Sequence, residues 1–161
     1  ILKIIIPKDF LLQSWRKDKM EKIIITSGYF DPLHKGHVEC LKLSKELGGK
    51  LIVILNNDKQ TILKKGKPFM NQEERKIILE AIKYVDQVFL SIDKDKSVVK
   101  SIEAIAKKYL NREIIFAKGG DKFSDNIPEA KICKKYNIKI IDRLGEKVQS
   151  SSNLTGLKEI K

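Results

Sequence analysis

The sequence has 161 residues, enough for one domain with its own core and too few for two ordinary domains. Its formal charge of +12 favours anionic partners such as phosphates and nucleotides, although evenly spread lysines also fit a solvated surface. No stretch approaches the roughly 18 apolar residues of a membrane span, and the two separated cysteines, Cys40 and Cys133, argue against a disulfide framework. We therefore expect a cytoplasmic protein without a membrane partner.

Short apolar runs alternate with amphipathic stretches along the chain. The expected strands are residues 23–26, 51–55, 85–90, 114–117 and 138–141. The expected helices are residues 36–47, 75–83, 97–109 and 128–136, with a further helix at 10–17 and a last one from Ser150. Residues 56–70 are polar and lysine-rich, which predicts a loop. Apolar strands joined by helices predict an α/β fold with a Rossmann-like, doubly wound, five-stranded parallel sheet in a single domain.

The two histidines of the sequence, His34 and His37, lie three positions apart, directly after the first expected strand and at the start of the first helix. Sheets of this kind bind ligands at the carboxyl ends of their strands. A helix N-terminus with two imidazoles and Lys35 would bind an oligophosphate, and Gly36 lets the backbone approach it. Two alternatives stay open: solvated or capping histidines, and a zinc site that the two cysteines complete.

The segment around the histidines, Gly-Tyr-Phe-Asp-Pro-Leu-His-Lys-Gly-His at 28–37, resembles the H-x-G-H segment of the cytidylyltransferase-like nucleotidyltransferase superfamily. The likeness covers about residues 20–155 and includes Asn57-Asp58 and Gln72-Glu73-Glu74-Arg75. It implies transfer of a nucleoside monophosphate from CTP or ATP to a small phosphorylated acceptor, with release of pyrophosphate. Glycerol 3-phosphate, a phospho-amino-alcohol or a sugar phosphate is the implied acceptor, and Mg²⁺ accompanies the NTP. By the same likeness His34 and His37 stabilise charge at the reacting phosphorus, as phosphoryl-type transfer requires.

The resemblance also implies roles for residues outside the histidine pair. Lys65 and Arg75 would be catalytic, and Asp58, Lys64 and Lys67 would bind the acceptor. Three segments would bind the nucleotide: Gly28, Tyr29, Phe30, Asp31, Lys35 and Gly36; Lys118, Gly119, Gly120 and Asp121; Ser150, Ser151 and Ser152. Plainer alternatives are a solvated charge run for the lysines, a surface pair with a glutamate for Arg75, a turn for the glycines and a helix cap for the serines. No metal ligand is expected from the protein alone.

One segment departs from the pattern of cytidylyltransferases for glycerol 3-phosphate and phosphocholine. Those enzymes usually carry R-T-x-G-I-S-T, whereas residues 143–150 here are Arg-Leu-Gly-Glu-Lys-Val-Gln-Ser. The departure, together with Lys118-Gly119-Gly120-Asp121, moves the likeness toward the adenylyltransferase domain of ADP-heptose synthases. Adenylyl transfer to heptose 1-phosphate, to FMN or to a nicotinamide or pantetheine phosphate therefore stays open, as does a non-catalytic nucleotide-binding module.

The resemblance also predicts the domain boundaries and the partners of the chain. Residues 20–161 are expected to form the nucleotidyltransferase domain, and residues 1–19 an N-terminal extension or linker. A homodimer is implied by resemblance alone. We expect no nucleic-acid partner, because the sequence shows neither stacking aromatics nor clustered arginines.

Overall fold

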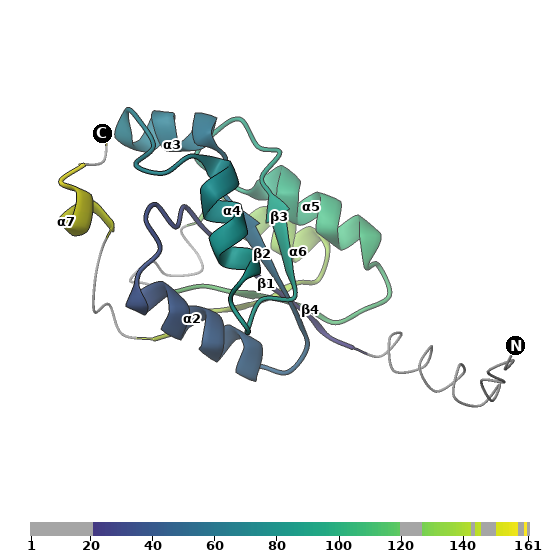
Figure 1. Cartoon of the computed structure of the whole chain (residues 1–161). Coiled ribbons are helices and arrows are strands. Elements are labelled where there is room, and N and C mark those ends of the chain that lie inside the picture. Colours follow the sequence, from purple (N-terminus) through teal and green to yellow (C-terminus); the bar gives the residue numbers. More distant parts are fainter. Residues whose placement is uncertain (1–20, 120–126, 143, 146–150, 158–159, 161) are drawn as a thin grey trace, which may run out of the picture.

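A computed structural model describes residues 21–119, 127–142, 144–145, 151–157 and 160 (Figure 1). The strands in this part of the chain are β1 Ile23–Gly28, β2 Lys50–Leu55, β3 Gln87–Leu90, β4 Ile114–Ala117 and β5 Lys139–Ile141. They form one five-stranded sheet in the order β3-β2-β1-β4-β5, and every neighbouring pair is parallel. The predicted Rossmann-like, doubly wound sheet is confirmed.

Helices cover both faces of this sheet (Figure 1). They are α2 Lys35–Glu46, α3 Asp58–Lys65, α4 Gln72–Glu80, α5 Val99–Lys108, α6 Ala130–Lys135 and α7 Ser151–Thr155. Successive β1 side chains point to opposite faces: Ile24 packs with Leu41 of α2 and Leu79 of α4, whereas Ile25 packs with Ile102 of α5. Each isoleucine buried in this way stabilises the fold by roughly 1.5–3 kcal/mol relative to an exposed one, so the sheet holds the site rigidly.

The strand order reverses between β1 and β4. From β1 the chain moves outward through β2 to β3, then returns to the other side of β1 to form β4 and β5. Connections leaving β1 and β4 therefore diverge, which opens a crevice at their carboxyl ends, where open α/β sheets bind ligands. The segments that follow Gly28 and Ala117 border this crevice.

The prediction of a single loop over residues 56–70 is wrong, because α3 lies within it. The Asn57 side chain accepts the N–H of Gln60 at 3.0 Å, and the Gln60 side chain accepts the N–H of Asn57 at 3.1 Å. Gly66 ends the helix at φ 83°, where its N–H donates to the carbonyl of Ile62. This capping box and glycine C-cap stabilise the helix despite its polar, lysine-rich sequence.

The other expected strands and helices within the described part of the chain are present, with ends shifted by at most three residues. The helix expected at 10–17 and the extension at 1–19 lie outside the described residues. None of the helices in the described segments is long and apolar enough to span a bilayer.

Candidate active site

The two histidines lie at the start of α2, after the connection that follows β1. His34 is the N-cap residue of α2, and His37 lies in its first turn. Their rings stack with centroids 3.7 Å apart and planes 22° apart. The edge of Phe30 contacts His37 at a centroid distance of 4.9 Å, and Phe30 is itself anchored in the core between the sheet and α2. The imidazoles are thus held in a fixed orientation by a core side chain.

A backbone hydrogen bond defines the proton position on His37. The N–H of His34 donates to Nδ1 of His37 at 3.3 Å, which places the proton of a neutral His37 ring on Nε2. Burial lowers the pKa of both imidazoles, and the neighbouring His34 and Lys65 lower that of His37 further, to about 3. Nδ1 of His37 therefore caps the start of the helix, as the capping alternative expected. Nε2–H of the same neutral ring remains available as a donor for phosphate oxygens.

The N-terminus of α2 differs from those of the neighbouring helices. Its first turn, which is fully described, contains no acidic residue and carries the exposed Lys35 and the half-buried Gly36. In contrast, the first turn of α4 contains two glutamates, and two N–H groups of α5 donate to the carboxylate of Asp93. The partial positive charge at α2 therefore remains available to an anion.

Lys65 and Asp31 connect the histidine segment with the chain that precedes α4. Lys65 is 8% exposed, and its ammonium donates to the carbonyl of Asp31 at 3.0 Å. The carboxylate of Asp31 is fully buried and accepts the N–H groups of Phe69 and Met70 at 2.9 and 2.7 Å. Asp31 thus shapes the loop beneath the site with its side chain, and Lys65 brings positive charge close to His37.

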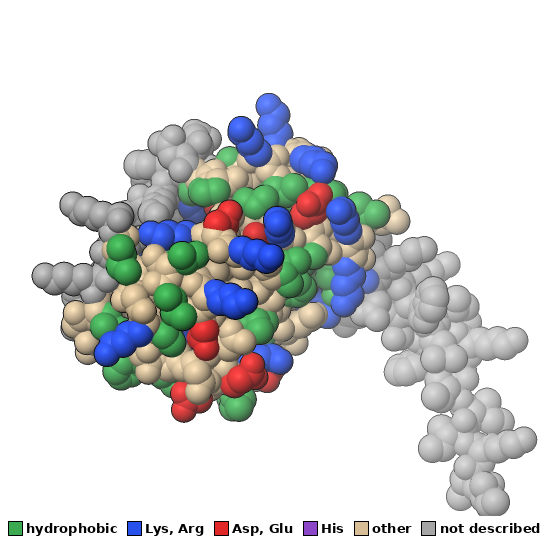
Figure 2. Space-filling view, turned by 90° about the horizontal axis from the view of Figure 1, so that it is seen from above, with side chains coloured by type: hydrophobic (Ala, Val, Ile, Leu, Met, Phe, Trp, Pro, Cys, Tyr) green, Lys and Arg blue, Asp and Glu red, His purple; other side chains and the backbone are tan. Residues whose placement is uncertain are grey.

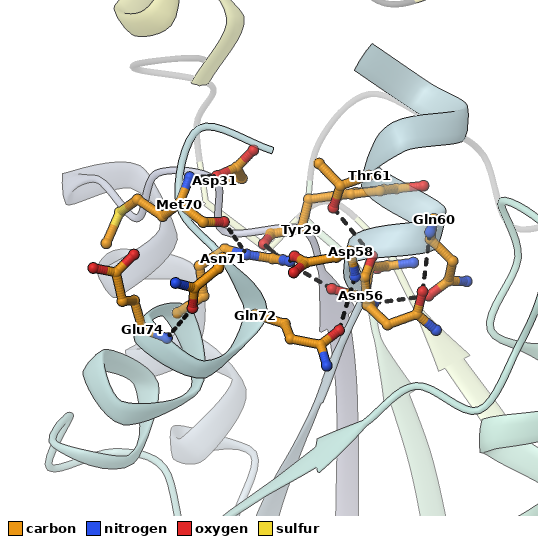
Figure 3. A network of polar contacts seen from close by, with 12 residues as sticks. Tyr29, Asp31, Asn56, Asp58, Gln60, Thr61, Met70, Asn71, Gln72 and Glu74 are labelled. Atoms are coloured by element: carbon orange, nitrogen blue, oxygen red, sulfur yellow. Dashed lines mark hydrogen bonds and ion pairs between the residues drawn. The ribbon is translucent and has the colours of Figure 1, made fainter. Parts of the chain in front are cut away.

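The buried side chain of Arg75 joins the segments that follow β1 and β2, where Figure 3 labels its partners Tyr29, Asn56 and Asp58. Its side chain is fully buried and donates to the carbonyls of Met70, Tyr29 and Asn56 at 3.0, 2.7 and 2.8 Å. Nη2 donates to Oδ1 of Asp58 at 2.6 Å. A surface pair with a glutamate, the alternative for this arginine, is therefore wrong. The guanidinium and the Asp58 carboxylate neutralise each other while they fix the segment after each strand.

A cleft of about 780 Å³ opens on the α5 and α6 side of β1. Ser27 of β1 and Phe116 of β4 line it, together with Tyr29 and Lys118, which directly follow these strands. The rest of the lining comes from Lys64, from residues 93–97, 99 and 100, and from residues 127–129. The Lys64 ammonium lies 4.3 Å from the centre of the Tyr29 ring. Basic side chains are also prominent over the surface that Figure 2 shows.

Five lysines and three carboxylates line this cleft. The carboxylate of Asp93 accepts two N–H groups of α5, and that of Glu129 accepts the N–H of Val98 at 3.0 Å. The side chain and backbone of Ser97 donate to Asp95, which lowers the pKa of that carboxyl. All three carboxylates keep their charge, but Lys64, Lys94, Lys96, Lys100 and Lys118 outnumber them, so the cleft has an excess of positive charge.

The segment after β4 lies between this cleft and α2. Lys118 lines the cleft, whereas a Cβ atom added to Gly119 would lie 2.8 Å from Sγ of Cys40 in α2. Glycine is thus required for close packing here, beyond any need for a turn. From the other side, the hydroxyl of Ser151 at the start of α7 donates to the carbonyl of Pro32 at 3.0 Å. Gly120, Asp121, Ser150 and the side chain of Ser152 lie outside the described residues.

The zinc alternative is wrong for the described residues, which include both histidines and both cysteines. They contain no group of three or more His, Cys, Asp or Glu side chains that could hold a metal. Cys133 packs in the core between the sheet and α5, on the opposite face from α2. Burial raises the pKa of its thiol to about 11, which disfavours the thiolate that zinc needs.

Comparison with known proteins places this site in a family, because the sequence model for cytidylyltransferase-like proteins matches residues 25–153. The chain belongs to the cytidylyltransferase-like family. The match runs from β1 into α7 and so includes every described element of the site.

Relatives of this cytidylyltransferase-like chain carry several names. It is 41% identical over 109 residues to the bifunctional protein HldE of Blochmanniella floridana, covering 66% of this chain and 21% of that one. It is 39% identical over 122 residues to an FAD synthase of Thermococcus sibiricus, covering 74% of this chain and 78% of that one. A solved lipopolysaccharide core biosynthesis protein of Thermoplasma volcanium superposes with a TM-score of 0.60 at 25% identity, covering 78% and 98% of the two chains. The chain spans 21–52% of the length of several curated relatives.

The cytidylyltransferase-like domain brings some predicted site residues together and separates others. Lys65 lies near the histidines, and Lys64 and Lys118 line the cleft. Lys67 is exposed between α3 and α4 and does not belong to the cleft lining. The sequence analysis missed the loop that follows β3, with Lys94 and Lys96, and Lys100 in the first turn of α5. Its position after a strand was the available signal, since all carboxyl ends of a parallel sheet share one edge.

Proposed function

We propose that this chain transfers a nucleoside monophosphate from CTP or ATP to a small phosphorylated acceptor. The observation that carries the proposal is the stacked pair His34 and His37 at the N-terminus of α2, whose first turn has no acidic residue, beside the strand-order reversal. Membership of the cytidylyltransferase-like family supports it.

In the proposed reaction an oxygen of the acceptor phosphate attacks the α-phosphorus of the NTP. A new P–O bond forms, the bond from the α-phosphorus to the oxygen shared with the β-phosphate breaks, and pyrophosphate leaves with that electron pair. An ionised phosphate oxygen needs no general base. The Nε2–H of His37, together with His34 and the α2 N-terminus, donates to oxygens that gain charge in the transition state.

Some of the remaining predicted residues are assigned to contact with the nucleotide, and Arg75 is assigned to positioning the segments around it. We assign Lys35 and Lys65 to the phosphates, Gly36 to backbone approach, and Tyr29 and Lys118 to the cleft side of the nucleotide. Arg75 acts as a positioning residue, because its guanidinium donates to three carbonyls and to Asp58 inside the protein. The roles predicted for the remaining nucleotide-binding positions stay predictions: Gly28, Phe30, Asp31, Gly119, Gly120, Asp121, Ser150, Ser151 and Ser152.

Mg²⁺ would be held through the nucleotide. No group of three metal-ligating side chains occurs in the segments that the structure describes, so we assign the ion to oxygens of the β- and γ-phosphates. There it would neutralise charge on the departing pyrophosphate.

The acceptor is assigned to the cleft beside Tyr29. Its lysines suit a phosphate, and its Val99, Phe116 and Ile127 suit the less polar body of the acceptor. Of the residues predicted for this role, Lys64 lines the cleft, Asp58 pairs with Arg75, and Lys67 would have to reach from the neighbouring loop. Heptose 1-phosphate and FMN stay candidates beside glycerol 3-phosphate and phospho-amino-alcohols, since HldE and FAD synthase are both relatives.

Pyrophosphate release tests the proposal. The full chain is incubated with Mg²⁺ and either CTP or ATP, against glycerol 3-phosphate, phosphocholine, phosphoethanolamine, heptose 1-phosphate and FMN in separate reactions. Turnover with one donor and one acceptor identifies the reaction. Nucleotide binding without turnover for any acceptor would favour the non-catalytic nucleotide-binding module. Sedimentation of the same sample tests the homodimer that the resemblance implies.

A further inference from the structure

The loop between β3 and α5 is held by side chains from another element, α3. The Nδ2 of Asn57, the N-cap residue of α3, donates to the carbonyls of Ser91 and Asp93 at 2.9 and 3.0 Å. These bonds fix the start of the loop to the start of a helix more than thirty residues earlier in the chain.

Gln60 holds the second half of the same loop. Its Nε2 donates to the carbonyls of Asp95 and Ser97, both at 2.7 Å, and its side chain is fully buried. Its Oε1 accepts the N–H of Asn57, so every polar atom of the amide is used. A buried polar group that loses its partner destabilises the fold, so this arrangement is sensitive to the replacement of a donor atom by an acceptor.

The opposite end of α3 contacts Tyr29 and the segment that carries the two histidines. Lys64 lies over the ring of Tyr29, and the next residue, Lys65, donates to the carbonyl of Asp31 beside the histidine segment. One short helix therefore contacts both the loop that lines the cleft and the segment that carries His34 and His37.

We propose that Asn57 and Gln60 are positioning residues for the acceptor. They hold residues 91–97 so that Lys94 and Lys96 line the cleft at a fixed distance from Tyr29 and Lys64. The inference rests on the proposed acceptor site, and it assigns a role in acceptor affinity to two amides that line neither the cleft nor the histidine pair.

Two isosteric variants remove only the hydrogen bonds that these amides donate to the loop carbonyls. Gln60→Glu keeps an oxygen for the N–H of Asn57 but turns the other amide atom into an acceptor that faces two carbonyls. Asn57→Asp does the same at the N-cap, where aspartate preserves capping. The matched control is Thr61→Val, which removes a buried hydroxyl bonded within α3 to the carbonyl of Asn57 and has no bond to the loop.

Hydrogen exchange of the ligand-free full chain gives the first measurement. A peptide that covers residues 91–98 should exchange about ten times faster in Gln60→Glu and in Asn57→Asp than in wild type. Thr61→Val should leave that peptide unchanged. Equal protection in wild type and both variants would overturn the inference. If Gln60→Glu does not fold, the exchange of Asn57→Asp alone tests whether α3 holds the loop, because aspartate preserves the N-cap.

Steady-state kinetics give the second measurement, with whichever acceptor of the panel is turned over. The acceptor KM should rise about tenfold in both variants while the NTP KM stays within about twofold. The difference in acceptor KM between Gln60→Glu and wild type should become smaller at lower pH. The protonated carboxyl of the introduced glutamate can then donate a hydrogen bond to one of the two carbonyls. Equal changes in both KM values, or none, would overturn the positioning role. If wild type turns over no acceptor, the proposed function fails, whereas the exchange result still decides whether α3 holds the loop.

Discussion

The backbone N–H of His34 donates to Nδ1 of His37 while the two imidazoles stack at 3.7 Å. The bond orients the second ring and assigns its proton to Nε2, and the stack disfavours a second positive charge beside the first. Both effects give a pair of neutral N–H donors before any ligand binds. Donors of this kind are pre-organised for charge that develops on phosphate oxygens during transfer.

Loss of either imidazole should therefore affect the chemical step. We expect His34→Ala and His37→Ala to lower kcat by about 10²–10³-fold, the usual effect of one lost transition-state donor. Lys42→Ala on the exposed surface of the same helix is the control and should keep wild-type kcat. Turnover is measured as pyrophosphate release, with circular dichroism to confirm the fold. Near wild-type kcat in His37→Ala would contradict the proposed mechanism.

The lowered pKa of His37 should make stability depend on pH. Its pKa is 6.5 when unperturbed and about 3 in the folded chain, so below pH 6.5 the unfolded chain binds a proton that the folded chain does not. The contribution of a neutral His37 is thus complete above pH 6.5 and is lost progressively as the pH falls toward 3. The slope has a limit of about 1.4 kcal/mol per pH unit, which solvent contact of the ring reduces.

Urea unfolding of wild type and His37→Gln at pH 7.5 and pH 5 isolates this effect. The wild-type free energy of unfolding should fall more between the two pH values than that of the variant, because glutamine does not titrate. An identical fall in both proteins would show that other groups carry the pH dependence.

Much of the fold follows from local pattern. The apolar runs at 23–26 and 51–55 are flanked by helical periodicity, and the structure places both in the centre of the parallel sheet. The sequence did not predict helix α3, because Lys64 and Lys65 at its end, followed by Gly66 and Lys67, resemble a polar loop. The capping box of Asn57 and Gln60 was the sequence signal that could have revealed it.

The candidate site was predictable to a smaller extent. The two histidines lie three positions apart at a helix start, so their proximity could be inferred directly from the sequence. Arg75 shows why other roles could not: a motif indicates which residue matters but not whether its side chain points into solvent or into the protein. Its burial depends on contacts with Tyr29 and Asn56, which directly follow β1 and β2 and which only the folded chain brings together with α4.

Replacement of the buried arginine should therefore affect stability first. We expect Arg75→Met to lower the free energy of unfolding by about 3–5 kcal/mol, because it leaves the Asp58 carboxylate and three carbonyls without their partner. The neighbouring Lys76→Met removes an exposed pair with Glu80 and should cost no more than about 0.5 kcal/mol. Urea unfolding compares the two. A stable Arg75→Met protein that loses turnover would instead support the direct catalytic role that the family resemblance implies.

The close approach of Gly119 to Cys40 predicts a pair of compensating substitutions. Gly119→Ala would place Cβ 2.8 Å from Sγ of Cys40, so the segment after β4 must move away from α2. We expect a loss of about 1–3 kcal/mol in the free energy of unfolding, the usual cost of overpacking, and a weaker affinity for NTP. Cys40→Ala removes the sulfur and should restore most of both losses in the double variant, which urea unfolding and calorimetric titration with CTP or ATP measure. Additive losses in the double variant would mean that the backbone at Gly119, rather than its contact with Cys40, requires glycine.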